Sequence, residues 1–350
     1  MRHWKRYLSL ILPTLIISGC SAPSLTTETP SKEELKQEQS VQLEKAFRYQ
    51  LKQQTRLAEV SRPLLTKNIE ACGKRTKPSL GILIHSLDDY KKPKKAVVTS
   101  VYSLTDQPSI LKVLNNGPAH QKLQIGDKLV SINQQAFPKG TAKSIKHLSS
   151  NLKDQTTVEL TVERDEDLIT LSIKPELLCN YPVILSPSDS INGYADGSTI
   201  VITQGLMRFA KDDNELALII AHEMAHNTQH HIPQRIKNSS LGLLLDTALL
   251  TSGIPSPLIA TGLGANLYTQ QYEIEADLIG LQLMHKAGLE IEGLDLFWQK
   301  MAAVHPSTIT KGKEISHPTT VERSILIRKE ITRLKNLTSS VNQTSSATLK

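Results

Sequence analysis

The sequence contains the string HEMAH and, later in the chain, the string EIEAD. On a helix, residues four apart share one face, so the imidazoles of His222 and His226 could reach a single metal ion. Glu223 lies on the neighbouring face, where its carboxylate could take a proton from a water molecule at that metal. A catalytic zinc site needs one more protein ligand and an open position. Glu273 is the candidate for that ligand, and Asp277, one helical turn further, could orient a histidine ligand from behind.

Helix signals place both motifs on buried helices. Asp212 and Asp213 are typical helix-start residues, and apolar residues follow them at helical spacing as far as HEMAH. Pro233 cannot continue a helix, so this helix should end just before it. EIEAD lies in a helix-like run over residues 268–286, which Gly288 closes. The sequence therefore predicts two helices that bring the candidate ligands together.

Other interpretations of these motifs remain open. HEMAH could be a chance string on a surface helix, and the acids of EIEAD could form a structural salt bridge, because buried unpaired carboxylates are costly. Metzincins place a third histidine six residues after the second, and Ile232 occupies that position here. A carboxylate third ligand therefore fits better. His230 and His231 lie further along the axis than a third ligand should, and we interpret them as surface groups or as groups behind the ligands.

HEMAH, EIEAD and the later SHPTTVER together resemble the HtpX/Oma-type zinc metallopeptidases, the gluzincins of metallopeptidase family forty-eight. The resemblance covers about residues 181–331. It implies an α+β fold, in which a mainly helical zincin-type metallopeptidase domain carries a small sheet. It also implies one Zn²⁺ per chain, held by His222, His226 and Glu273. Glu223 would be the general base, and Asp277 would be the acid that orients a histidine ligand from behind.

The same resemblance concerns the substrate. The segment INGYADGSTIVITQGLMRFA is similar to the family's active-site edge strand and the helix after it. Substrate would lie extended along a strand over residues 193–202, starting at Gly193, Tyr194 and Ala195, and would add its backbone to the sheet. His317 matches a histidine near the site. It could donate to the developing oxyanion, fill the metal's open position at rest, or only hold a helix start, and Tyr272 is a second candidate for the oxyanion.

The N-terminus has the pattern of a bacterial lipoprotein export signal. Three basic residues precede a short apolar run, which is too short to span a membrane. The tetrapeptide before and including Cys20 resembles a lipobox, so cleavage would leave a lipidated cysteine as the new N-terminus. An uncleaved anchor with a chance cysteine is the alternative. In a Gram-negative cell, such acyl chains, palmitate among them, would anchor the protein to the outer membrane, facing the periplasm.

Composition argues against a nucleic-acid partner. The formal net charge of +7 falls to +4 when residues 1–19 are removed, because that segment holds three basic and no acidic side chains. Aromatic residues make up only 4% of the chain, and no stripe interleaves them with basic residues. The expected partners are instead protein or peptide substrates and, through the lipid anchor, the membrane.

The middle of the chain changes to strand-like alternation, in LGILIH (80–85), AVVTSV (96–101), KLVSIN (128–133), VELTVER (158–164) and LITLSIK (168–174). A helix is expected over residues 142–152. GPA followed by IGDKLVSIN resembles a PDZ domain, a β-sandwich or barrel-like fold that precedes the peptidase. The resemblance implies that peptide C-termini bind by strand addition, with KPSLGI matching the carboxylate-binding loop. A degenerate PDZ domain that only packs on the peptidase is the alternative.

Two cysteines flank this domain. Cys72 and Cys179 are an even pair in an oxidising compartment, and the ends of a PDZ domain lie near each other, so a disulfide is possible. Two unrelated thiols are the alternative. The expected division is 1–19 signal peptide, 20–75 tether and amphipathic helical segment, 76–178 PDZ domain, 179–337 zinc metallopeptidase domain and 338–350 disordered tail.

The apolar segment 241–267 is broken by Gly253, Pro255 and Pro257, so neither half reaches the ~20 residues of a membrane span. A helical pair beside the active site is expected, with a peripheral lipid contact as the alternative. The whole chain is thus expected to be a lipid-anchored zinc endopeptidase of envelope-protein quality control. A PDZ-based adaptor or chaperone for misassembled outer-membrane proteins, with rare or gated cleavage, is the second hypothesis.

Overall fold

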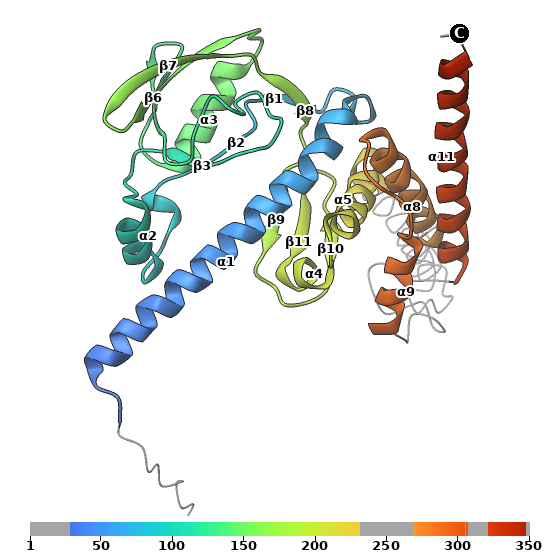
Figure 1. Ribbon diagram of the computed structural model, residues 1–350, viewed down its shortest axis with the longest axis horizontal. Coiled ribbons are helices and arrows are strands. Elements are labelled where there is room, and N and C mark those ends of the chain that lie inside the picture. Colours follow the sequence, from blue (N-terminus) through green and yellow to red (C-terminus); the bar gives the residue numbers. More distant parts are fainter. Residues whose placement is uncertain (1–28, 232–268, 305, 307–320, 348–350) are drawn as a thin grey trace, which may run out of the picture. The chain divides into compact units, whose positions relative to one another are not determined.

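The computed structural model describes residues 29–231, 269–304, 306 and 321–347, with side chains described as far as Leu337. Residues 1–42 and residues 43–350 form two compact units. The first unit contains the beginning of helix α1 (Lys32–Lys67). The expected signal peptide, Cys20, segment 241–267 and His317 lie outside the described residues. In the part that the structure describes, helices and sheets combine in an α+β fold (Figure 1).

The middle of the chain forms an antiparallel sheet with one helix against it, as the alternating pattern predicts. The strand order is β2-β3-β4-β6-β7, and the short β5 (Gln135–Ala136) pairs with β4. Every second residue of β6 is buried, which is the period of a half-buried strand. Helix α3 (Thr141–Leu152) follows β5. The strands of this sheet are β2 (Ile82–His85), β3 (Ser109–Val113), β4 (Lys128–Ile132), β6 (Val158–Arg164) and β7 (Asp167–Ile173).

The strand predicted over residues 96–101 is wrong. These residues lie in helix α2 (Lys94–Tyr102), and β3 is the strand that pairs with β2 instead. A run of valines favours a strand by propensity, but this preference depends on packing. Here Val98 is fully buried and packs with Phe47 of α1 in a small apolar cluster. Tertiary packing therefore overrides the local preference.

Strands β1 (Thr76–Ser79) and β8 (Glu176–Cys179) pair antiparallel at the two ends of this region. Helix α1 contacts the same neighbourhood through Arg62, whose guanidinium binds the carboxylate of Glu176 at 2.7 Å. On both sides of Arg62, apolar side chains of α1 enter the core of the C-terminal region, and these are Leu57, Val60, Leu64 and Leu65. The segment for which the sequence predicts one or two amphipathic helices is thus a single helix, whose second half is built into a core.

The C-terminal region combines a three-stranded sheet with helices. Strands β9 (Val183–Ser186), β10 (Gly193–Ala195) and β11 (Ile200–Thr203) have the order β10-β11-β9, so β10 is an edge strand. The predicted single strand over 193–202 is wrong, because β10 and β11 form a hairpin. Asp196 accepts hydrogen bonds from the backbone N–H of Ser198 and Thr199 at 2.7 Å, and Gly197 takes a positive φ of 89° to complete the turn.

The helices of this region are α4 (Gln204–Phe209), α5 (Asp213–Thr228), α8 (Thr269–Lys286), α9 (Asp295–Val304) and α11 (Val321–Ala347). Helices α5 and α8 lie side by side, and α11 contacts α8 (Figure 1). The tail expected to be disordered from residue 338 is instead helical as far as Ala347. Serine, threonine and glutamine are permissive in helices, so a polar run can continue a helix that packing has already started.

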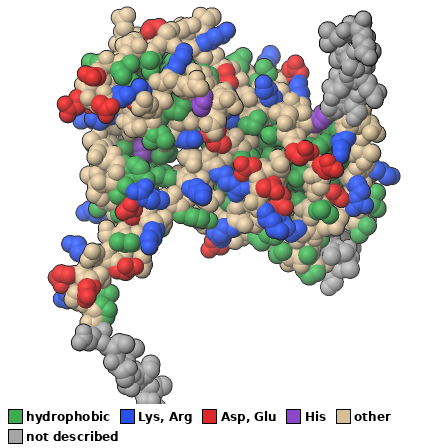
Figure 2. Space-filling model, viewed as in Figure 1, with side chains coloured by type: hydrophobic (Ala, Val, Ile, Leu, Met, Phe, Trp, Pro, Cys, Tyr) green, Lys and Arg blue, Asp and Glu red, His purple; other side chains and the backbone are tan. Residues whose placement is uncertain are grey.

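The surface carries charges of both signs. On the face shown in Figure 2, Lys and Arg side chains are interspersed with Asp and Glu side chains. The exclusion of a nucleic-acid partner remains a prediction from composition. Among the described residues, we find no helix whose length and hydropathy would suit a membrane crossing.

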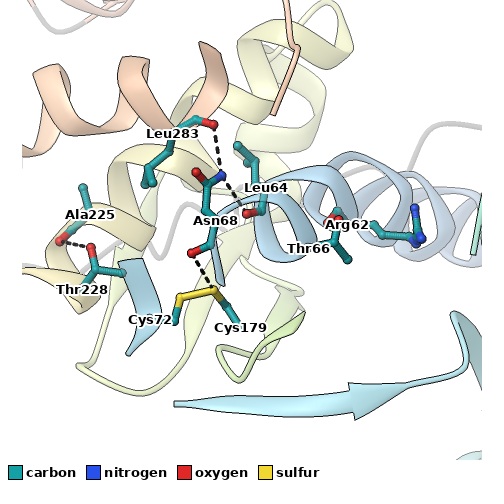
Figure 3. The surroundings of a disulfide bond; sticks show 9 residues. All are labelled: Arg62, Leu64, Thr66, Asn68, Cys72, Cys179, Ala225, Thr228 and Leu283. Carbon is teal, nitrogen blue, oxygen red and sulfur yellow. Dashed lines mark hydrogen bonds between the residues drawn. A yellow bond between two sulfur atoms is a disulfide. The ribbon is translucent and has the colours of Figure 1, made fainter. Parts of the chain in front are cut away.

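Cys72 and Cys179 are joined by a disulfide across 107 residues of sequence (Figure 3). Both cysteines are buried in the C-terminal core. Asn68 lies beside the bridge, where its side-chain N–H group donates to the carbonyl of Leu64 at 2.9 Å and to that of Leu283 on α8 at 3.0 Å. The disulfide and Asn68 therefore tie the end of α1 to β8 and to α8.

We expect that replacing both Cys72 and Cys179 by serine will destabilise the protein. A closed loop of about a hundred residues contributes on the order of 4–5 kcal/mol in the chain-entropy model, often less in practice. Denaturant unfolding of the double variant and of the parent, with and without reductant, measures the difference. Reductant should lower the stability of the parent only. Equal stability of parent and variant under oxidising conditions would contradict the prediction.

Candidate metal centre

Helix α5 carries the first two candidate ligands in a buried environment. Asp212 caps the helix, and its carboxylate accepts hydrogen bonds from the backbone N–H of Asn214 and Glu215. Every residue of α5 from 216 to 227 is buried. His222, Glu223 and His226 are therefore surrounded by apolar side chains and are 1–3% exposed. Charged and polar groups in such a place require partners.

Helix α8 supplies those partners because it crosses α5 closely. A Cβ atom placed on Gly280 would lie 3.1 Å from the backbone nitrogen of His222. Only a glycine allows the two backbones to approach this far without displacement. The close crossing brings Glu273 and Asp277, both 1% exposed, to the histidines of α5. Both motifs of the sequence thus meet at one buried point.

We expect Gly280→Ala to weaken metal binding. The added methyl group presses on the backbone of α5, which cannot rotate away as a side chain could, so α5 and α8 shift apart by a few tenths of an ångström and Glu273 moves with α8. Overpacking of this kind costs about 1–3 kcal/mol. Competition with a chromophoric chelator measures zinc affinity. Gly288→Asn is the control, because Gly288 has a positive φ that asparagine tolerates and open space around it. Equal zinc affinity of Gly280→Ala and parent would refute the argument.

The side chains of His222, His226 and Glu273 form a cluster that could hold a metal ion. The Nε2 atoms of the two histidines lie 3.1 Å apart. The carboxylate oxygens of Glu273 lie 3.4 Å from Nε2 of His222 and 3.5 Å from Nε2 of His226. Tetrahedral zinc with ligand bonds of about 2.0–2.1 Å places its ligand atoms about 3.4 Å apart. The distance to His222 is from Oε2 of Glu273 and the distance to His226 is from Oε1, and the three residues can bring one ligand atom each to within 4.8 Å of the others, close enough to hold one ion.

Each histidine makes a contact at Nδ1, on the side away from the cluster, so its Nε2 atom is directed toward the cluster. Nδ1 of His222 lies 2.9 Å from Oδ1 of Asp277, which can only accept when ionised. Nδ1 of His226 lies 2.9 Å from Nδ1 of His231. Histidine ligands usually donate their second N–H group in this way, which fixes the tautomer and the ring orientation. Asp277 thus lies where the sequence predicts an orienting acid.

Arg323 is a component of the site that the sequence reasoning missed. Its guanidinium is 1% exposed and donates to both carboxylate oxygens of Asp277, from Nε at 2.6 Å and from NH2 at 2.8 Å. NH1 also lies 3.4 Å from Glu273, and the group stacks over the ring of Trp298 at 4.5 Å. It is the last residue of the quoted string SHPTTVER. Its place at the end of SHPTTVER, a motif already assigned to the peptidase, was the signal in the sequence that could have marked Arg323 as part of the site.

The balance of charge favours a divalent cation. Glu223, Glu273 and Asp277 are three buried carboxylates, and Arg323 offsets only one of their charges. Burial would raise the pKa of Asp277, but the charge of Arg323 and the hydrogen bonds to it hold that pKa below its ordinary value. With His222 neutral, as a metal ligand must be, a divalent ion would cancel the two charges that Arg323 leaves. Buried charge of one sign is otherwise very costly.

The carboxylates around His222 also change the pKa of its imidazole. Burial alone would lower its pKa, but the hydrogen bonds and charges of Asp277 and Glu273 raise the pKa to about 10. A histidine must be neutral to bind a metal, so uptake of a metal should release a proton from His222. Apparent metal affinity should therefore rise as pH rises toward that pKa.

The edge strand β10 passes directly beside Glu223. A Cβ atom placed on Gly193 would lie 3.5 Å from Oε1 of Glu223 and 2.9 Å from the side chain of Ile219. Only a glycine leaves this space free. Tyr194, next along the strand, is 44% exposed, so its side chain points away from the core. An extended peptide paired with β10 would thus run past the Glu223 carboxylate.

The remaining predicted residues are placed as follows. Tyr272 stacks on the ring of His231 at 4.7 Å, which turns its ring toward that histidine. His230 is exposed, whereas His231 is buried behind His226, so of the two only His230 is a surface group. His317 is outside the described residues.

Comparison with known proteins identifies two domains. Residues 153–324 match the model of peptidase family M48, and residues 78–174 match the model of the PDZ domain. The chain contains a peptidase family M48 domain and a PDZ domain. The two matches overlap over residues 153–174, which β6 and β7 place in the PDZ sheet. The M48 domain is that of a metallopeptidase, and the candidate metal cluster lies within the matched residues.

Curated relatives resemble part of this chain. The β-barrel assembly-enhancing protease of Yersinia pestis is 32% identical over 130 residues, which cover 33% of this chain and 27% of the relative. That of Escherichia coli K12 is 30% identical over 33% of this chain and 26% of the relative. Mitochondrial metalloendopeptidase OMA1 of Arabidopsis thaliana is 27% identical over 38% of this chain and 30% of the relative. The chain thus matches only about a quarter of the length of the first two relatives.

A solved structure, the HtrA3 PDZ domain bound to a phage-derived ligand, is 20% identical and covers 29% of this chain and 88% of that chain. Its TM-score is 0.22, which is too low to carry an argument. The PDZ assignment rests on the family match to residues 78–174.

Proposed function

We propose that this chain is a zinc-dependent endopeptidase that hydrolyses peptide bonds of cell-envelope proteins, as part of their quality control. The observation that carries the proposal is the buried cluster of His222, His226 and Glu273, whose ligand atoms lie within 4.8 Å of one another. Two imidazoles and a carboxylate are the donor set that catalytic zinc uses in many peptidases. The fourth position then remains for water and substrate.

The residues of the chain would divide the chemistry as follows. Bound zinc supplies Lewis acidity to the scissile carbonyl and to the attacking water. Glu223, beside the cluster, takes a proton from that water and later passes it to the leaving amine. The backbone of β10, from Gly193 to Ala195, holds the substrate extended through strand addition. Asp277 and Arg323 keep the ligands oriented. His317 remains the proposed donor to the oxyanion, or a plug at rest.

The proposed address is the outer membrane, facing the periplasm, with acyl chains on Cys20 as the anchor. The lipobox-like sequence before Cys20 supports this proposal, and so does the disulfide, because disulfides persist in oxidising compartments. Replacing Cys20 by alanine should release the protein from the membrane fraction. Unchanged detergent partitioning of that variant would point to another anchor, such as segment 241–267.

The PDZ domain is proposed to bind peptide C-termini. A cavity of about 960 Å³ lies beside β2, and its lining includes Ile82 and Ile84 of β2 and Leu148 and Leu152 of α3. Strand β2 is an edge strand of its sheet, which is the position at which a peptide can add a strand. This groove also supports a second candidate function, an adaptor or chaperone for misassembled outer-membrane proteins.

The two functions differ in a direct test. The purified chain is incubated with an unfolded protein substrate before and after chelation, and zinc is then restored. Cleavage that stops with the chelator and returns with zinc supports the endopeptidase. In cells, Glu223→Gln is introduced into a deletion strain. If that variant restores every phenotype, binding is the main function and the proposed protease role is wrong.

A further inference from the structure

His231 reaches His226 because the chain turns sharply at the end of α5. The helix ends at Thr228, and His230 has a φ of 58°, in the left-handed region. In a continued helix, His231 would lie about 140° around the axis from His226. The turn brings it back instead, so that the ring centroids of His226 and His231 are 5.0 Å apart and their Nδ1 atoms 2.9 Å apart. His231 is 1% exposed.

Two side chains of α8 hold the far side of His231. The ring of Tyr272 stacks on it at 4.7 Å and 24°. Oε2 of Glu275 lies 3.3 Å from Nε2 of His231, and the Glu275 side chain is 49% exposed. These residues flank Glu273 in the sequence, so one helix carries a candidate ligand and the residues around His231. Helix α8 thus supports both candidate ligands of α5. Its Asp277 contacts His222 directly, whereas its Tyr272 and Glu275 contact His231, which in turn contacts His226.

The contact between the two rings fixes which nitrogen carries a proton. Two Nδ1 atoms in hydrogen-bond contact share one proton, so one ring donates and the other accepts. The Nε2 atom of His226 faces the metal cluster and must present a lone pair there, so Nδ1 of His226 is the donor. His231 must then accept at Nδ1 and carry its own proton on Nε2, the atom beside Glu275.

We propose that His231 is the positioning residue of His226, accepting its Nδ1–H, and that Tyr272, stacked on the His231 ring, and Glu275, 3.3 Å from its Nε2 atom, hold that ring in place. This proposal rests on the proposed metal site. His222 is oriented by the buried carboxylate of Asp277. His226 is instead oriented by the neutral ring of His231, which lies beside the half-exposed carboxylate of Glu275. A role in packing alone would require no particular tautomer of His231.

The first test is the tautomer of His231 in the zinc-loaded, full chain. Proton–nitrogen NMR spectra of the histidine side chains assign which ring nitrogen is protonated. We expect Nδ1–H for His226 and Nε2–H for His231. A proton on Nδ1 of His231, or on both of its nitrogens, would overturn the proposal. This measurement needs no substitution at His231 and therefore does not depend on the folding of a variant.

The second test is zinc affinity by competition with a chromophoric chelator. His231→Leu should bind zinc 10- to 100-fold more weakly, which is the usual effect of removing an outer partner of a ligand. His231→Asn should recover part of the affinity, because its Oδ1 atom occupies the position of the imidazole Nδ1 and can accept the same hydrogen bond. His230→Asn is the control, since His230 is exposed and asparagine tolerates its backbone conformation.

The outcomes separate this proposal from the proposed function. If the parent and His231→Leu bind zinc with equal affinity, the proposed role of His231 is wrong, but the metal site stands. A parent that binds no zinc overturns both the metal site and the role of His231. Equal losses in His231→Leu and His231→Asn would show that the ring packs rather than accepts, and would also overturn the proposal.

Discussion

Glu223→Gln is expected to lower peptide hydrolysis by about 100- to 10,000-fold, the usual contribution of a general base, while zinc content stays at that of the parent. Glu223 is buried beside the edge strand β10 but does not belong to the clustered set of His222, His226 and Glu273. The amide of glutamine keeps the shape of the side chain and loses its basicity. Hydrolysis of an unfolded protein and metal analysis of the same sample measure both quantities.

Asp213→Asn is the matched control, because Asp213 is an exposed carboxylate at the start of the same helix and pairs only at the surface with Arg56. It should leave hydrolysis and zinc unchanged. Loss of zinc in Glu223→Gln would mean that Glu223 is a ligand. Full hydrolysis by Glu223→Gln would mean that the base is a different residue.

Arg323→Met should be the most destabilising single substitution at the site. It leaves the carboxylates of Asp277 and Glu273 buried without their guanidinium partner, and breaking a buried ion pair in this way costs about 3–5 kcal/mol. Arg323→Lys should fall between this variant and the parent, because lysine keeps the charge but loses the two-pronged contact and the stacking on Trp298. Denaturant unfolding in the presence of chelator measures the loss without a metal contribution.

The control is Arg328→Met on the same helix. Arg328 pairs with Asp295, but its side chain is 59% exposed, so this pair should contribute less than about 1 kcal/mol. Similar losses for Arg328→Met and Arg323→Met would contradict the account of Arg323. Near-parent stability of Arg323→Met would do so as well.

The sequence was sufficient to predict the parts of the site that depend on local periodicity. Two histidines four apart, an aspartate cap and a closing glycine define helices α5 and α8, and the spacing of Glu273 and Asp277 places both on one face of α8. The PDZ strands β4, β6 and β7 follow from their alternation in the same way. These signals act within one element, so they are visible in one sequence.

The parts that were missed depend on contacts between distant segments. Arg323 lies 46 residues after Asp277, and nothing local tells an exposed arginine from one buried against a carboxylate. For His231 the sequence left open a place at the surface or behind the ligands, and no local signal announces the left-handed turn at His230 that brings it to His226. Likewise, α2 is a helix although it is rich in valine, because its Val98 packs with Phe47 of α1.

The zinc content of purified, dialysed protein decides whether the cluster of His222, His226 and Glu273 is a zinc site. We expect one zinc ion per parent chain, little or none in Glu273→Ala, and one per chain in Glu292→Ala, where the glutamate is exposed and pairs with Lys335 at the surface. Full zinc in Glu273→Ala would contradict the assignment of Glu273 as the third ligand. A parent chain that holds no zinc at all would contradict the metal centre itself.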